Sequence, residues 1–425
     1  MKPQTAKGVR DFAPEEKIMR QQVIDSLRSV FEEFGFNPIE TPIIEKYELL
    51  SSKYAGGEEI LKEVFKLKDQ GGRKLALRYD LTVPFARFIA MNPNIKMPFK
   101  RYQIGRVYRD GPIKLGRYRE FWQCDVDIVG NKNMAADAEM LAIADKVFKK
   151  LNLKITIKIN NRKILDGILA TSNISESKWI DAILSIDKLE KQGKEEVEKE
   201  LKRKGIKETK KIFNLIEKKD SNKKTIANLK KALTSDIGKQ GAKEMEDILT
   251  YLKSFDVKVD FDPSLARGLA YYTGPVYEIF LKDYNIPSAT AAGGRYDDMI
   301  GKFIGKNDYP ATGISFGVEV ITEALKMAKR ESKKSVVDIY IIPISTTNKS
   351  IKIAQELRNA GIKIDIDLAG KGPSKNLGYA NSFEIPYVLF IGSDELKKKK
   401  FKLKDMKTGK EKYLSLNSIV KKFTA

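Results

Sequence analysis

Strand-like runs separated only by short loops are the feature of this chain that most restricts its fold. Two of them, FKRYQIGRVYR and EFWQCDVDIVG, lie between residues 99 and 130 with a single loop between them. Parallel neighbours need a crossover of roughly a dozen or more residues, whereas antiparallel strands can be joined directly. The earlier runs VFKLKD and KLALRYDL are also separated by a short loop. The pattern therefore predicts a mainly antiparallel sheet.

Other stretches carry a helical pattern. Residues 15–34 have apolar side chains at three-to-four spacing, which predicts an amphipathic helix, and residues 135–151 predict another. From about residue 163 to 253 the chain is helical, charged and rich in Lys and Glu, and strand patterns resume at Val257. We therefore expect a helical module inserted in the sheet domain. Its charge has two readings, a solvated face or an RNA contact.

A different alternation follows the linker KRESKK at residues 329–334. VVDIYIIPI, a helix over 349–359 and GIKIDID form a strand–helix–strand unit, and a further helix near 377–383 precedes the strand YVLFIG. This predicts a small α/β domain with a largely parallel core. The expected divisions are a catalytic domain in two parts, 1–162 and 254–328, the helical insertion 163–253, and the α/β domain 335–425.

Composition limits the chemistry. The 425 residues include no histidine and one cysteine, which excludes Ser-His or Cys-His catalysis, metal ligation by histidine, and an internal disulfide. The net charge of +22 favours a polyanionic partner, although a Lys-rich surface has the same composition. No run approaches the ~20 apolar residues of a membrane helix, and the N-terminus lacks a secretory signal. We therefore expect a cytoplasmic protein without a membrane partner.

Two segments place arginines where an anion is the natural ligand. In LARGLAYYTGPVYEIF, Arg267 interrupts an apolar strand pattern, and a buried charge without a partner is very costly. The loop between the strand-like runs at 99–130 is crowded with cations, and arginine forks bind phosphate oxygens in pairs. A solvated basic loop is the alternative reading. The cations of this loop are Arg106, Arg109, Lys114, Arg117 and Arg119.

Together these segments resemble the histidyl-tRNA synthetases, a family of class II aminoacyl-tRNA synthetases. LARGLAYY and GGRYD are similar to the two signature motifs of the family, and the cationic hairpin is similar to class II motif 2. GFNPIETPIIE around Pro42 resembles motif 1, whose proline lies at the class II dimer interface. The resemblance implies an α+β fold: a class II antiparallel β-sheet catalytic domain with an inserted helical module, plus a C-terminal α/β anticodon-binding domain.

The resemblance also implies roles for the cations and for one aromatic residue. Arg109 matches the arginine that contacts the ATP α-phosphate, and Arg267 matches the family's second arginine at that phosphate. Arg117 would hold the γ-phosphate, and Phe121 would stack on adenine. We therefore expect Arg267 and Arg109 to be the catalytic residues.

A histidine pocket is implied beside them. Gln123 and Asp127 lie four apart on a strand, so their side chains share a face. A carboxylate is a charge-assisted acceptor for an imidazole N–H. In the family the matching pair orients the α-amino group and holds an imidazole nitrogen, and the segment ALRYDLTVPFARF resembles the loop that holds the ammonium group. The histidine-binding residues implied in this way are Asp80, Thr82, Gln123, Asp127, Tyr271 and Tyr272.

The expected reaction is ATP-dependent formation of histidyl-adenylate followed by transfer to tRNA-His. The expected ligands are ATP as a substrate, Mg²⁺, L-histidine and tRNA-His, bound by a homodimer. The substrate carboxylate is already ionised and attacks phosphorus directly, so the lack of histidine is no obstacle. The rival interpretations are a non-catalytic paralogue that senses histidine or tRNA, and a basic RNA-binding protein without activity. The C-terminal domain and the retained Arg267 argue against the paralogue.

Three positions depart from the family pattern. Gly111 replaces an acidic residue near the adenine end, Ala270 replaces an aspartate, and Val320 replaces the motif 3 arginine that clamps the γ-phosphate. Loss of a charged arginine–phosphate contact costs about 1.5–3 kcal/mol. We expect Arg117, together with Arg295 of GGRYD, to share that task.

Overall fold

The computed structural model describes residues 2–52, 58–113, 116–217, 220–267, 271–284, 286, 288–305, 309–328 and 333–424. Lys114, Ala270 and the linker positions 329–332 lie outside these ranges. The chain divides into two compact units, the first formed by residues 1–10 and 23–329 and the second by residues 11–22 and 330–425. Within the described ranges, no helix is both long enough and apolar enough to cross a bilayer.

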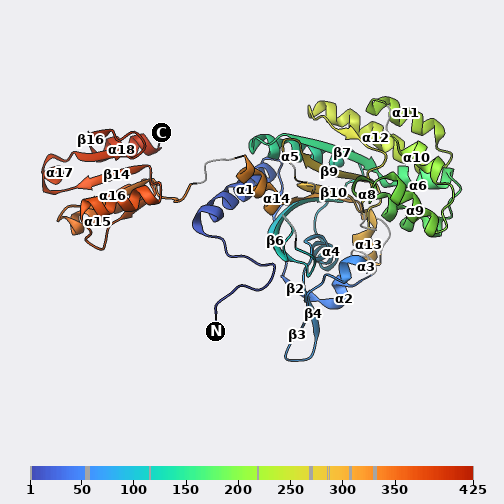
Figure 1. Cartoon of the computed structure of the whole chain (residues 1–425), viewed down its shortest axis with the longest axis horizontal. Coiled ribbons are helices and arrows are strands. Elements are labelled where there is room, and N and C mark those ends of the chain that lie inside the picture. The colour runs from blue at the N-terminus through green and yellow to red at the C-terminus, as the bar shows by residue number, and fades with distance from the viewer. Residues whose placement is uncertain are drawn as a thin grey trace. The chain divides into compact units, whose positions relative to one another are not determined.

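An eight-stranded sheet lies at the centre of the first unit, in the order β1-β5-β6-β11-β10-β9-β7-β8 (Figure 1). Neighbouring strands run antiparallel except at the two edges, where β1 is parallel to β5 and β8 is parallel to β7. The prediction of a mainly antiparallel sheet is confirmed. The strands are β1 (Asn37–Pro38), β5 (Phe99–Tyr108), β6 (Glu120–Val129), β7 (Ile155–Asn161), β8 (Asp260–Phe261), β9 (Pro275–Leu281), β10 (Ala291–Arg295) and β11 (Ala311–Gly317).

Helices α1 (Pro14–Glu33) and α5 (Ala135–Lys150) pack on one face of this sheet. Phe31 of α1 and Phe148 of α5 both contact Phe316 of β11, with ring centroids 5.6 and 6.2 Å apart, and all three rings are fully buried. Side chains alternate along a strand, so the neighbours of Phe316 in sequence point to the other face. That second face carries the polar residues of the site.

The part of the chain expected to be a helical module connects β7 to β8. Its described residues between Arg162 and Ser254 form helices and no strand, and these helices gather beside β7 (Figure 1). The helices are α6 (Arg162–Thr171), α7 (Trp179–Ile186), α8 (Leu189–Gln192), α9 (Lys194–Arg203), α10 (Thr209–Ile216), α11 (Asn222–Ala232) and α12 (Asp236–Ser254), with a 3₁₀ turn at Glu176–Lys178.

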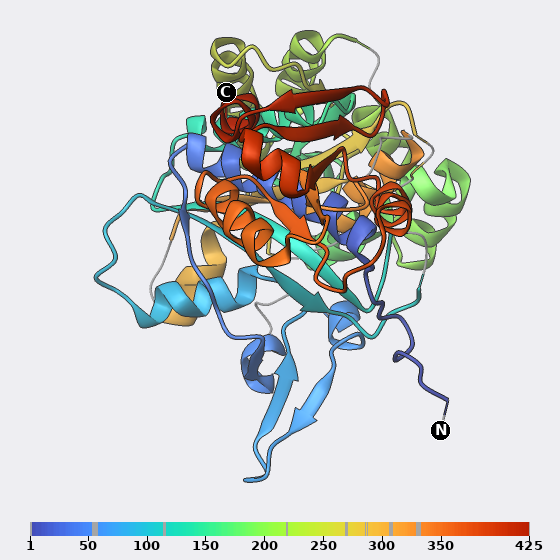
Figure 2. The same ribbon diagram turned by 90° about the vertical axis from the view of Figure 1, so that its left-hand side faces the viewer.

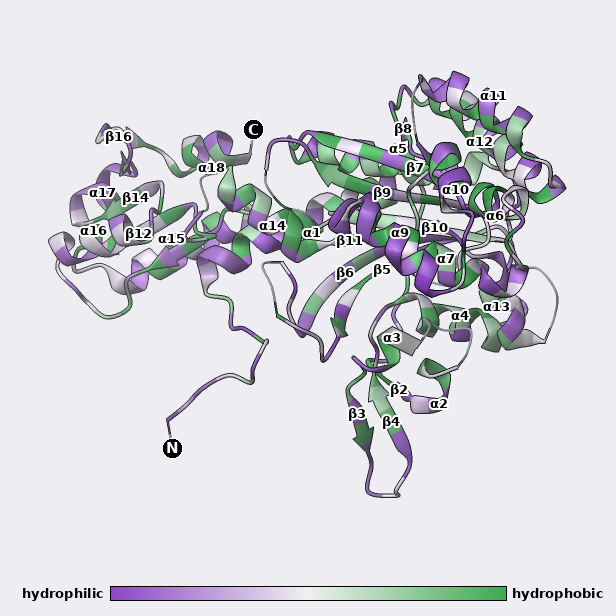
Figure 3. Cartoon of the chain, turned by 45° about the vertical axis from the view of Figure 1, so that its right-hand side comes forward, coloured by the Kyte–Doolittle hydropathy of each residue, from purple (hydrophilic) through white to green (hydrophobic). Residues whose placement is uncertain are grey.

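A smaller three-stranded sheet, β2-β4-β3, projects from the first unit (Figures 1 and 2). Ile44 lies opposite Leu77, and Leu67 lies opposite Leu75, so four apolar side chains share one face. Ile44 is 51% exposed and Leu67 40%, and β3 and β4 show hydrophobic colour in Figure 3. The remaining elements of the unit are β2 (Ile44–Lys46), β3 (Lys66–Lys68), β4 (Lys74–Leu77), α2 (Tyr47–Leu50), α3 (Glu58–Leu61), α4 (Thr82–Met91), α13 (Asp297–Ile304) and α14 (Val318–Met327).

The second unit contains a five-stranded sheet in the order β13-β12-β14-β15-β16. Its first three strands are parallel, as predicted, but β15 and β16 add an antiparallel hairpin that the sequence interpretation missed. Phe401 and Leu403 are buried, and the partly exposed Lys402 and Lys404 alternate with them, so the lysine-rich sequence did not suggest a strand. The elements are β12 (Ile339–Pro343), β13 (Ile364–Ile366), β14 (Tyr387–Ile391), β15 (Phe401–Asp405), β16 (Glu411–Leu414), α15 (Thr347–Asn359), α16 (Pro373–Ser382), α17 (Ser393–Lys398) and α18 (Leu416–Thr424).

A buried ion pair ties the main sheet to α5. Arg295 of β10 is 2% exposed, and its Nε donates to Asp137 Oδ2 at 3.1 Å. Its Nη1 donates to the Asn131 carbonyl at 3.0 Å, and the Thr312 hydroxyl donates to Asp137 Oδ1 at 2.8 Å. The expectation that Arg295 shares the γ-phosphate is wrong, because its guanidinium is buried against Asp137.

We predict that Arg295→Leu lowers the free energy of unfolding by about 3–5 kcal/mol, because it leaves the Asp137 carboxylate buried without its cation. The double variant Arg295→Leu/Asp137→Leu should lose much less. The two tryptophans, Trp122 and Trp179, both lie in the first unit, so urea unfolding followed by their fluorescence reports on that unit. A double variant as unstable as the single one would contradict this account.

Candidate active site

A cavity of 1330 Å³ opens on the polar face of the main sheet. Side chains from the loop before α4, from the β5–β6 hairpin and from the segment before β9 line it together. Apart from Arg295, the residues that the sequence assigns to ATP or histidine are among its lining: Asp80, Thr82, Arg109, Arg117, Phe121, Gln123, Asp127, Arg267, Tyr271 and Tyr272.

The floor of the cavity follows from strand register. On β6, Asp127 lies opposite Arg101 of β5 and Gly313 of β11, and Asp125 lies opposite Ser315 of β11. Residues directly opposite each other share a face, so these side chains meet above the same stretch of sheet. The result is a small polar floor with carboxylates in its middle row.

Asp127 is held from two sides. The Tyr296 hydroxyl donates to its Oδ1 at 2.5 Å, and Arg101 Nη2 lies 2.7 Å from its Oδ2. Burial raises the pKa of Asp127, and Arg101 and Tyr296 act against that rise. A Cβ atom on Gly313 would lie 1.9 Å from Asp127 Oδ1, so only glycine fits beneath this carboxyl group. The geometry leaves a carboxylate that can accept a further hydrogen bond.

Asp80 caps the start of α4 and also faces the cavity. Its Oδ1 accepts from the Val83 backbone N–H at 3.1 Å, in the first turn of α4, and its carboxyl group also lines the cavity. Burial raises the pKa of Asp80 to about 6, against the effect of the Val83 hydrogen bond and of Arg109. Thr82, the first residue of α4, lies beside it on the cavity wall.

The basic end of the cavity is formed by the β5–β6 hairpin. Arg109 donates from Nε to the Tyr79 carbonyl at 3.0 Å, and its guanidinium lies 5.1 Å from the Phe121 ring centroid. Arg117 Nη2 lies 2.8 and 3.0 Å from the two carboxylate oxygens of Glu63. The other described cations of this loop do not line the cavity, since Arg106 pairs with Glu120 and Arg119 with Asp110.

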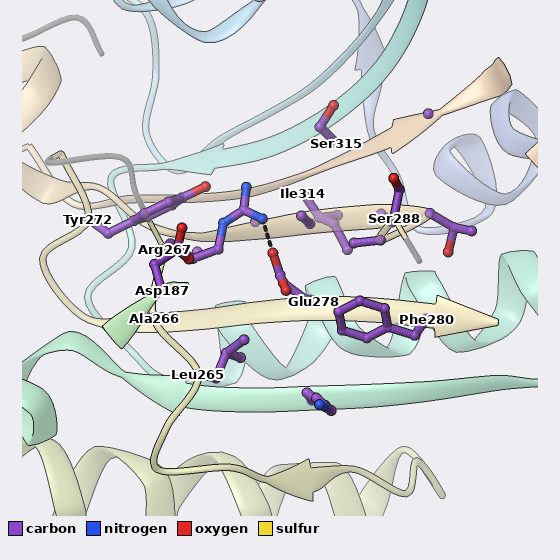
Figure 4. Close-up of a pocket in the computed structure, with 18 of the residues that line it drawn as sticks. Asp187, Leu265, Ala266, Arg267, Tyr272, Glu278, Phe280, Ser288, Ile314 and Ser315 are labelled. Atoms are coloured by element: carbon purple, nitrogen blue, oxygen red, sulfur yellow. Dashed lines mark hydrogen bonds and ion pairs between the residues drawn. The ribbon is translucent and has the colours of Figure 1, made fainter. Parts of the chain in front are cut away.

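Arg267 points across the cavity at β9. Its Nη1 forms a very short ion pair with Glu278 Oε1 (Figure 4). Its Nε is buried and has no hydrogen-bond partner among the residues that the structure describes. The rings of Tyr271 and Tyr272, with centroids 4.8 Å apart, continue the same wall. An anion entering the cavity therefore meets a guanidinium whose position is set by a carboxylate.

Five residues of the site were missed by the sequence interpretation: Arg101, Asp125, Tyr296 and Glu278, together with Glu63 in the loop after α3. Asp125 carries a signal, since it lies two residues from both Gln123 and Asp127 and therefore shares their face. Tyr296 belongs to the GGRYD segment, which was recognised as a motif. The other three depend on contacts between distant segments.

Two of the three departures from the family pattern can be located. A Cβ atom on Gly111 would lie 2.6 Å from Glu63 Oε1, so a carboxylate from another loop already occupies the space beside position 111. Val320 is 8% exposed in the first turn of α14, and its Cγ2 lies 3.3 Å from the Cβ position of Gly116. Val320 is therefore a packing residue beneath the motif 2 loop.

Comparisons with known proteins identify the family. The chain matches the histidyl-tRNA synthetase family over residues 8–321 and the anticodon-binding domain over residues 338–425. It is 47% identical to histidine–tRNA ligase 1 of Bacillus cereus, over 99% of this chain and 97% of that protein. It is 37% identical to the histidine–tRNA ligase of Clostridium tetani, over 99% of this chain and 98% of that protein.

The fold agrees as well. The crystal structure of histidyl-tRNA synthetase from Nostoc superimposes with a TM-score of 0.89 at 31% identity, covering 100% of this chain and 99% of that one. The similarity thus extends over both units and over every segment that lines the cavity. The chain belongs to the histidyl-tRNA synthetase family.

Proposed function

We propose that this chain is a histidine–tRNA ligase, which activates L-histidine with ATP and transfers the histidyl group to tRNA-His. The observation that carries this function is a cavity lined by the side chains assigned to ATP and to histidine, with the exception of Arg295. The full-length similarity to ligases supports it. Nothing favours a paralogue that only senses histidine or tRNA, or a basic RNA-binding protein without activity.

In the first reaction the histidine carboxylate attacks the α-phosphate of ATP. Arg267 and Arg109 contact that phosphate and stabilise the charge that grows on it in the transition state. Glu278 positions Arg267 through their ion pair. Arg117 leaves Glu63 to hold the γ-phosphate, and the adenine ring stacks on Phe121.

The amino acid is recognised from the floor and walls of the same cavity. Asp127, kept in its charged form by Arg101 and Tyr296, accepts the imidazole N–H. Tyr271 and Tyr272 pack beside the ring. The residues that bind the α-ammonium group include Asp80, Thr82 and Gln123.

In the second reaction a ribose hydroxyl at the end of tRNA-His attacks the histidyl-adenylate, and a phosphate oxygen of the adenylate accepts its proton.

The catalytic domain comprises residues 1–162 and 254–328, the helical module residues 163–253, and the anticodon-binding domain residues 335–425. The net charge of +22 favours binding of the tRNA backbone. The compartment is the cytoplasm, where charged tRNA is used.

Magnesium enters with the nucleotide. Among the described residues, no cluster of three acidic or thiol side chains could hold a metal ion by itself. A magnesium ion bound with ATP would neutralise phosphate charge, while Arg109 and Arg267 align the α-phosphate.

The active form is a homodimer. The outer face of the β2-β4-β3 sheet carries Ile44, Leu67, Leu75 and Leu77, and the first two are 51% and 40% exposed. An apolar sheet face of this kind favours burial against a partner. Pro42 of the motif 1 segment lies two residues before Ile44 in the chain.

The first prediction tests the reaction itself. The purified chain should catalyse histidine-dependent exchange of pyrophosphate into ATP, and Arg267→Ala should slow this exchange roughly 10²–10³-fold, because one transition-state contact is lost. Histidine binding, measured by calorimetry, should change little. Arg106→Ala is the matched control, since Arg106 is half-exposed and pairs with Glu120 outside the cavity. Equal rates for Arg267→Ala and the wild type would remove Arg267 from the mechanism.

The second prediction concerns Asp127. Asp127→Asn should raise the Michaelis constant for histidine about tenfold or more, because a charge-assisted acceptor becomes a neutral amide. Tyr296→Phe should raise it less, since the carboxylate remains. The Michaelis constant for ATP, measured in the same exchange assay, should stay nearly constant in both variants. A larger effect on ATP than on histidine would show that Asp127 does not bind the imidazole.

The third prediction concerns the dimer. The double variant Ile44→Lys/Leu67→Lys should sediment as a monomer, because burying two charges per protomer at the interface is too costly. The variant Ile351→Lys/Leu368→Lys replaces two exposed apolar residues of the second unit and should stay dimeric. Sedimentation velocity distinguishes the two, and an unchanged mass for the first variant would place the interface elsewhere.

A further inference from the structure

Asp125 is a buried carboxyl group that none of the roles above uses. It is 3% exposed, it lies in the middle row of the cavity floor, and it lines the cavity. Its Oδ1 is buried and has no hydrogen-bond partner among the residues that the structure describes. A buried polar atom without a partner is costly, so a carboxylate oxygen left in this state at a binding site points to a ligand.

The neighbours of Asp125 leave it without a cation of its own. Arg101 lies closest to Asp127, 2.7 Å from Oδ2, and its guanidinium also stacks on Phe85 at 4.0 Å. Gln123 Nε2 donates to Ser315 Oγ at 2.8 Å, so the amide is directed at the hydroxyl. Burial raises the pKa of Asp125 to about 7. Arg101 and a hydrogen bond with Ser315 lower it, and the negative charges of Asp127 and Asp80 raise it further.

Asp80, Asp125 and Asp127 therefore differ in the partners that stabilise their negative charge. Asp127 has Arg101 and Tyr296, which suits it to accept from an imidazole ring that carries no full charge. Asp80 already uses Oδ1 on the Val83 N–H. Asp125 is stabilised by the charge of Arg101 and by a hydrogen bond with Ser315, but its Oδ1 has no hydrogen-bond partner among the described residues. A permanent cation gains most from such a group, because the attraction between full charges is strong in a buried site.

We propose that Asp125 binds the α-ammonium group of histidine, next to Asp80 and Gln123. The inference rests on the proposed function, since it identifies a further specificity-determining residue of the same pocket. Asp125 lies two residues after Gln123 and two residues before Asp127 on the same face of β6, so it lies between the residues proposed to bind the ammonium group and the imidazole ring. The pocket would then recognise the two ends of histidine with different carboxylates: Asp127 binds the imidazole ring, and Asp125 binds the ammonium group.

The experiment uses Asp125→Asn in the full-length chain and two competitors of histidine. Histidinol has both the imidazole ring and the ammonium group, and its deamino analogue has only the ring. Asp125→Asn should weaken histidinol about tenfold or more, the loss expected for a charged hydrogen bond, and leave the deamino analogue nearly unchanged. Asp127→Asn, the matched control one strand period away, should weaken both ligands.

The variant is expected to fold. The folded state raises the pKa of Asp125 above that of an unfolded aspartate, so at neutral pH the ionised group opposes folding and a neutral, isosteric amide relieves this cost. Urea unfolding followed by tryptophan fluorescence verifies this before binding is measured.

Each outcome decides between the alternatives. Equal weakening of both competitors by Asp125→Asn, or weakening of neither, would overturn the ammonium assignment. Selective weakening of histidinol supports it, whether or not the wild-type chain exchanges pyrophosphate. A wild-type chain that binds histidinol through Asp125 but shows no exchange would refute the ligase activity and leave the ammonium assignment standing.

Discussion

The pairing of Arg101 with Asp127 across β5 and β6 is the constraint on which the rest of the site depends. Both side chains are almost completely buried, and neither charge could be tolerated there without the other. A shift of one residue between these two strands would turn one of the two charges toward the face covered by α1 and α5 and leave the other without its partner. The ion pair therefore selects one register, and that register brings Gln123, Asp125 and Asp127 to the cavity.

The antiparallel sheet and, apart from Arg295, the residues of the ATP and histidine pocket could be predicted from the sequence, because strand alternation and motif spacing are local properties. The sequence interpretation missed Arg101, because the importance of that residue depends on which strands become neighbours, and no local pattern contains that information. It also missed Glu278, whose importance depends on the contact that Arg267, eleven residues earlier in the same segment, makes with β9. Asp125 was within reach, since a period of two marks it as a companion of Gln123. The antiparallel hairpin of the second unit was not predicted, because the lysines that alternate with its apolar residues resemble a solvent-exposed segment without regular structure.

The position of Glu63 explains how the chain accommodates Gly111, one of its departures from the family pattern. Its carboxylate fills the space beside Gly111 and holds Arg117, so the acidic group that the motif lacks is supplied by a separate loop. The same contact pairs the guanidinium of Arg117 with a carboxylate. In the proposed reaction the γ-phosphate would have to displace Glu63 from Arg117, and the released carboxylate would then lie close to the anion that replaced it.

The two strands that flank the helical module run parallel to each other, with Lys158 of β7 paired to Asp260 of β8. After one parallel strand ends, the polypeptide must return along the length of that strand before the next can begin. A tight turn cannot make this connection. The helices between them are thus the return path of the main chain, not an appendage that the sheet could shed. Evolution can lengthen or shorten this path freely, but only down to the roughly dozen residues of a minimal crossover.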